Sequence, residues 1–138
     1  MDLVNDIDFK SLVIGAAISA GIVIIASQGY DWLMLMSSVG LLYVGYKAKN
    51  VKYGAILGAI ASTPIVYLTF IGTLGEFSGY FSTQVGTISV VILILLIGAF
   101  IGFVGAWVKR SREKAKVDYE KKQNIGKNKK KNKKKNNN

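Results

Sequence analysis

The sequence predicts an all-α integral membrane protein: a four-helix transmembrane bundle with a disordered basic C-terminal tail. Three observations predict this fold class: hydrophobic residues fill 51% of 138 positions, the mean hydropathy is +0.34, and the apolar residues gather in long blocks. Residues 109–138 hold 14 of the 18 Lys and Arg and three acids, a net charge of +11. We therefore expect a transmembrane domain at 1–108 and a separate basic tail at 109–138.

The first apolar block predicts a span over about residues 10–27, near the shortest length that crosses a bilayer. A cleaved signal peptide is the alternative, because the block is rich in Ala. The preceding stretch carries Asp2, Asp6 and Asp8 against the single Lys10, whereas signal peptides begin with a positive segment. We therefore expect this helix to be retained.

The second block predicts a span over about residues 31–46. Aromatic side chains lie at both of its ends, as in the interfacial belts of membrane proteins: Tyr30, Trp32, Tyr43 and Tyr46. The apolar run is only about fifteen residues long. A buried hairpin helix that does not cross the membrane is therefore the alternative.

The third and fourth blocks predict spans over about 53–75 and 85–108. Pro64 removes one helical hydrogen bond from the third span, so we expect a kink there. The fourth block contains a β-branched run at 90–97 that would suit a buried strand in isolation. Its setting within roughly two dozen uncharged residues predicts a membrane helix instead.

The basic tail has two parts. Residues 111–123 suit a short surface helix, whereas 124–138 contain almost only Lys and Asn. Such a segment buries too little apolar surface to offset the entropy of ordering, so we expect disorder from about residue 124.

Anionic lipid headgroups are the expected partner of the tail, because each Lys or Arg near a membrane surface contributes about 1 kcal/mol of attraction. A purely solubilising tail is the alternative. Nucleic acid is disfavoured as a partner, since no aromatic side chain follows Tyr119 to stack on bases. The residues expected to contact anionic lipid are Lys109, Arg110, Arg112, Lys127, Lys129, Lys130, Lys131, Lys133, Lys134 and Lys135.

Orientation follows from the distribution of basic residues, which favour cytoplasmic loops. The turn at 47–52 carries three lysines and the tail carries most of the rest, and four crossings place both in the cytoplasm. The connections at 28–31 and 76–84 contain no Lys or Arg and suit the outer face. We therefore expect a multi-pass protein of the cell membrane with N- and C-termini cytoplasmic.

Small residues at four-residue spacing predict how the helices pack. Lipid provides no hydrophobic drive for helices to associate, so close backbone contact must hold them together. We expect packing within one chain, and the alternative is the interface of a homo-oligomer. The expected helix-packing residues are Gly15, Ser19, Gly54, Gly58, Gly98 and Gly102.

The composition argues against an enzyme. The chain contains no Cys and no His, which are the commonest metal ligands and the commonest general base near neutral pH. Inside the predicted spans, away from their ends, there is no Asp, Glu, Lys or Arg, and Asp31 and Glu76 are expected at the outer interface. We expect no enzymatic activity, no catalytic residue, no cofactor and no metal.

The stretches 40–46 and 54–59 are Gly-rich and flank a short polar turn. In this respect the chain resembles, over roughly 12–108, a family of small archaeal four-span membrane proteins of unknown function. Members of that family usually have a more glycine-rich turn where this chain has 47–52. The resemblance implies the four-span topology and no activity.

The predicted function is that of a small structural or interaction protein of the membrane. The alternative is a holin-like pore former or a small-solute permeation protein, since phage holins are also small, multi-span and basic-tailed. A soluble nucleic-acid binder is a third hypothesis, which would require the apolar blocks to form a water-soluble core.

Overall fold

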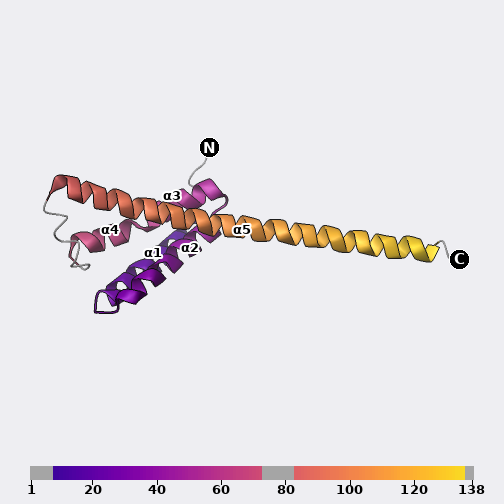
Figure 1. Cartoon of the computed structure of the whole chain (residues 1–138), viewed down its shortest axis with the longest axis horizontal. Coiled ribbons are helices and arrows are strands. Elements are labelled where there is room, and N and C mark those ends of the chain that lie inside the picture. Colours follow the sequence, from indigo (N-terminus) through magenta and orange to yellow (C-terminus); the bar gives the residue numbers. More distant parts are fainter. Residues whose placement is uncertain (1–7, 73–82, 136–138) are drawn as a thin grey trace. The chain divides into compact units, whose positions relative to one another are not determined.

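The computed structural model consists of helices joined by short connections in the residues that it describes (Figure 1). The structure describes residues 8–72 and 83–135, and no strand occurs within them. The chain separates into two compact units, Met1–Trp107 and Val108–Asn138. Three helices of the described part are long and apolar enough to cross a membrane: Phe9–Ala26, Val51–Phe70 and Gln84–Gln123. The N-terminal residues 1–7, most of the 76–84 connection including Glu76, and residues 136–138 lie outside the described part.

Helix α1 (Phe9–Ala26) corresponds to the first predicted span. It begins after Asp8, whose carboxylate accepts hydrogen bonds from the backbone N–H (3.2 Å) and the hydroxyl (2.5 Å) of Ser11. The connection that follows contains Gly29 at φ +104°, a left-handed conformation that glycine adopts without strain. The first span is therefore one regular helix.

The second predicted span is irregular. It consists of a 3₁₀ helix, η1 (Asp31–Ser37), followed by α2 (Ser38–Lys47), and it is not among the three long apolar helices. Because a 3₁₀ helix rises about 2.0 Å per residue and an α-helix about 1.5 Å, this segment extends about 29 Å. Helix α1 extends about 27 Å by the same rule. The two neighbours therefore have similar lengths.

The third span consists of α3 (Val51–Ala61) and α4 (Thr63–Phe70). The helix is interrupted at Ser62, and Pro64 lies in the first turn of α4, where its missing N–H costs no helical hydrogen bond. The Ser62 hydroxyl donates to the carbonyl oxygen of Ala59 at 2.7 Å. The position at which the sequence predicts a kink is thus a one-residue interruption, and helix ends at Phe70.

The last helix, α5 (Gln84–Lys135), is much longer than the predicted fourth span. Its backbone stays helical through 124–135, where the sequence predicts disorder, so the structure does not confirm a disordered tail. The physical reason is that the prediction considered only the lack of apolar surface. Lys is among the better helix-forming residues, and no Pro interrupts the segment.

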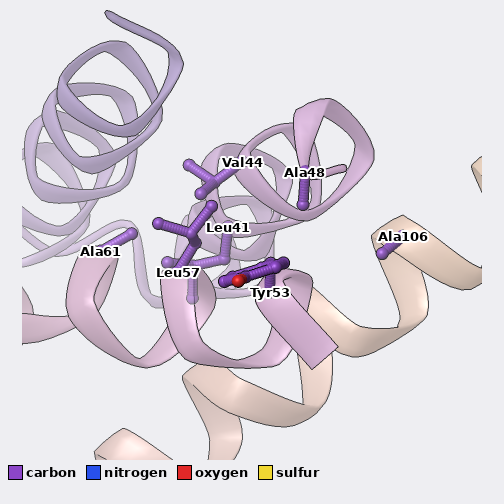
Figure 2. Packing of buried hydrophobic residues seen from close by; sticks show 7 residues of the cluster. All are labelled: Leu41, Val44, Ala48, Tyr53, Leu57, Ala61 and Ala106. Carbon is purple, nitrogen blue, oxygen red and sulfur yellow. The ribbon is translucent and has the colours of Figure 1, made fainter. Parts of the chain in front are cut away.

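Successive helical segments of the first unit run antiparallel. Gly15, early in α1, packs against Gly40 and Val44 of α2, and Gly54, early in α3, packs against Ala106 of α5. The buried cluster formed by α2, α3 and α5 is shown in Figure 2. Its members are Leu41, Val44, Ala48, Tyr53, Leu57, Ala61 and Ala106. It follows that the start of α1, the α2–α3 turn and Ala106 share one end of this unit.

Candidate functional site

The outer surface of the first unit is apolar. Only 17% of the most apolar window of α5 is buried, and Phe100 and Leu96 are 69% and 64% exposed. The exposed side chains follow one another at helical spacing: Ile88, Ile92, Leu96, Phe100, Phe103 and Trp107. Soluble monomers rarely expose a continuous apolar surface of this kind. The helices are therefore compatible with a location in a membrane.

The contact between α3 and α5 is lined by glycine. A Cβ atom at Gly98 would lie 2.7 Å from the carbonyl oxygen of Gly58, and one at Gly58 would lie 2.8 Å from the Cα of Gly102. One at Gly54 would lie 2.8 Å from the carbonyl oxygen of Gly102. Because these neighbours are backbone atoms, the helices approach as closely as their main chains allow. Four of the six expected helix-packing residues thus meet within one chain.

The other two expected packing residues face α2. A Cβ atom at Gly15 would lie 2.6 Å from the carbonyl oxygen of Gly40. Ser19 is fully buried, and its hydroxyl donates to the carbonyl oxygen of Ser37 at 2.8 Å. Ser37 is the last residue of η1, so this hydrogen bond joins α1 directly to the junction between η1 and α2.

Sequence reasoning missed the packing glycines of α2. Gly40 and Gly45 are five residues apart, which separates them by about 140° around an α-helix. Gly40 consequently faces α1, whereas Gly45 faces α5, where its Cβ would lie 2.8 Å from the Cα of Gly102. A search for four-residue spacing on one face cannot find a helix that is packed on two faces. Gly105 of α5 was missed too, and it packs on Leu42 and Tyr46 of α2.

Lysines lie at the end of the first unit where α1 begins and α2 ends. Lys10 is the second residue of α1, Lys52 is the second residue of α3, and both are exposed. Lys47 ends α2, also exposed, with its ammonium nitrogen 5.9 Å from the centre of the Tyr43 ring. The hydrogen bonds from Ser11 lower the pKa of Asp8, and the positive charge of Lys47 lowers it further. Lys47 therefore acts electrostatically on the start of α1.

The expected lipid-contact residues lie in the second unit. Arg110 and Arg112 are exposed and Lys109 is partly buried. Arg110 lines an open hollow on the helix surface together with Glu113, Lys114, Val117 and Asp118. The seven lysines between 127 and 135 lie on helical backbone, and their side chains are outside the described part.

No group of three or more His, Cys, Asp or Glu side chains is placed to hold a metal ion in the part of the chain that the structure describes. Comparisons with protein-family models, curated proteins and solved structures find no match. The resemblance to the archaeal four-span family is therefore untested by them.

Proposed function

We propose that the protein is a small multi-pass protein of the cell membrane, without enzymatic activity, that serves a structural or interaction role. The observation that carries the proposal is the contrast between the two sides of its helices. Large apolar side chains face outward, while glycine and serine line the contacts between helices. This distribution suits a hydrocarbon solvent, in which close packing and hydrogen bonds, not burial of apolar surface, hold helices together.

Two observations support a fourth crossing by residues 31–47. The segment extends about 29 Å, close to the roughly 30 Å of a bilayer's hydrocarbon core. Serine hydroxyls also satisfy carbonyls around the 3₁₀ segment: Ser37 donates to Met34 and Ser38 to Leu35, each at 2.7 Å, and Ser19 donates to Ser37. An irregular helix is tolerated in a membrane only where its backbone polar groups find such partners.

The orientation is supported by the position of the charges. All four lysines of residues 1–108 lie at or beside the end of the first unit that contains the start of α1 and the α2–α3 turn. Four crossings also put the basic tail on that side. Since basic residues favour cytoplasmic loops, both termini are cytoplasmic in this proposal, with the tail near anionic headgroups.

Reporter fusions test the topology. A reporter at either terminus should be active in the cytoplasm, and one inserted at 76–84 should be active outside. A second insertion at 28–31 should also report an outer location. If it reports the cytoplasm while the 76–84 insertion stays outside, residues 31–47 do not cross and the four-span proposal fails.

Fractionation and membrane potential test the proposed role. The protein should stay in the membrane pellet after carbonate and high-salt washes. Induced expression should leave the membrane potential intact, whereas a holin-like pore former would collapse it.

A further inference from the structure

Two helices of the first unit, α1 and α3, carry a lysine in their first turn. Lys10 and Lys52 each occupy the second helical position, and neither α1 nor α3 has an acid in its first turn. The N-terminus of a helix is the positive end of its dipole, so acids are favoured there and lysines are disfavoured. Asp8 offsets part of this charge at α1, whereas α3 is capped by the neutral Asn50, whose side chain accepts from the N–H of Tyr53 at 2.9 Å. The α3 start is therefore left strongly positive.

Lys47 adds a third cation at the same end. It ends α2, and only residues 48–50 separate it from the start of α3, so it flanks the same turn as Lys52. Helix α1 packs antiparallel to α2, with Gly15 against Val44 one turn before Lys47, so Lys47 lies toward the end of α1 that contains Lys10. Asp8 itself is engaged with Ser11 through both carboxylate oxygens. The exposed Lys10, Lys47 and Lys52, together with Lys49 of the turn, thus lie at the same end of the unit as Asp8, whose carboxylate is already engaged.

Apolar side chains accompany each of these lysines. Phe9 precedes Lys10 and is 55% exposed, Tyr46 precedes Lys47 and is 37% exposed, and Ile56 lies one turn after Lys52 and is 51% exposed. A free phosphate ion would gain nothing from these apolar neighbours. A phospholipid would be stabilised by both kinds of side chain, because its phosphate can contact the ammonium groups while its acyl chains cover the apolar side chains.

We propose that Lys10, Lys47 and Lys52 form a binding site for the headgroup phosphate of an anionic phospholipid, and that this site operates without the basic tail. The inference rests on the proposed membrane location and adds a second lipid contact to that of the tail. The aromatic face of Tyr43 holds the Lys47 ammonium by a cation–π contact, which restricts its side chain before lipid arrives.

Native mass spectrometry of the full chain in detergent, with added phosphatidylglycerol or phosphatidylcholine, tests the site. Three variants are compared with the original chain: the triple Lys10→Gln, Lys47→Gln, Lys52→Gln variant; the matching triple Lys→Arg variant; and a variant in which the seven lysines of 127–135 are Gln. We expect phosphatidylglycerol affinity to fall about fivefold for each lysine neutralised in the triple Gln variant. The Arg variant and the tail variant should retain tight binding, and phosphatidylcholine should bind weakly throughout.

Several results would overturn the site. The triple Gln variant could bind phosphatidylglycerol as the original chain does, or the tail variant could lose all binding. Equal displacement by inorganic phosphate at the lipid's concentration would show an ion site instead of a lipid site. Should the triple Gln variant fail to fold, the single Lys52→Gln variant must show its fivefold loss. Carbonate extraction of the original chain reports separately on the membrane location, so failure of the proposed function is distinguishable from failure of this site.

Discussion

Replacement of Gly102 by Ala should separate α5 from α3 where the two helices are closest. A Cβ atom there would collide with the carbonyl oxygen of Gly54 and lie 2.8 Å from the Cα of Gly58, both in α3. All of these neighbours are main-chain atoms, which cannot move aside by a change of rotamer. Helices α3 and α5 would have to shift apart, and the contact of α5 with Gly45 of α2, whose own Cβ would lie 2.8 Å from the Cα of Gly102, would weaken with them.

The loss of stability caused by Gly102→Ala is best measured by comparison with a second variant, Gly21→Ala in α1. A Cβ atom at Gly21 would meet nothing within 4 Å, so this variant changes only helix propensity. Ala exceeds Gly in propensity by about 1 kcal/mol at both sites. The difference between the two variants therefore isolates overpacking, for which about 1–3 kcal/mol is expected, toward the upper end because the obstacles are backbone atoms.

Reversible unfolding in mixed detergent, or steric trapping, measures this difference. Gly21→Ala should be as stable as the original chain or more so, and Gly102→Ala should be less stable than Gly21→Ala by about 1–3 kcal/mol. If the two variants have equal stability, the close approach of α3 and α5 is not a feature of the folded protein.

Three further predictions concern hydrogen bonds at helix ends and junctions. Ser19→Ala should destabilise the protein by about 1 kcal/mol in the same unfolding assay, because the partly buried carbonyl of Ser37 loses the hydrogen bond from the Ser19 hydroxyl, while Ser27→Ala, at an exposed site, should be neutral. Asn50→Ala should cost about 1 kcal/mol through loss of the α3 cap, and Asn50→Asp should restore most of it; equal stability of all three would refute the cap. Since the hydrogen bonds from Ser11 hold the folded-state pKa of Asp8 below its ordinary value, the stabilising effect of Asp8 is complete above that ordinary value and is lost as pH falls through the folded pKa. Thermal unfolding at pH 5 and pH 3 should accordingly show a smaller acid-induced loss for Asp8→Asn than for the original chain.

Apolar length predicted the first, third and fourth helices because it is a local property of the chain. The start of α1 at Phe9 and the start of α5 at Gln84 lie within one residue of the predicted spans. The glycines of α3 and α5 were predictable for a similar reason, since their four-residue spacing places them on one face. The helical conformation of the C-terminal part of α5 was not predictable in this way. Low hydrophobicity limits burial, but it does not prevent a lysine-rich segment from forming a helix.

The 3₁₀ segment could not be predicted because its cause lies elsewhere in the chain. The hydroxyl that satisfies the carbonyl of Ser37 belongs to Ser19, eighteen positions earlier. Gly40, at the start of α2, also packs on Gly15 and Ser19, so the junction between η1 and α2 is fixed by α1. The sequence of residues 31–47 alone therefore does not indicate these contacts with α1.

In the proposed four-span topology, the 3₁₀ geometry of residues 31–37 would help this segment to match the bilayer. As a regular α-helix, seventeen residues would extend only about 26 Å, and the seven residues in 3₁₀ form add about 3.5 Å. Each ångström of mismatch between a helix and the bilayer costs a fraction of a kcal/mol, so the longer form is favoured wherever its carbonyls are satisfied. Ser19, Ser37 and Ser38 supply those hydrogen bonds. A segment that is too short by residue count thereby reaches the length of the helix beside it.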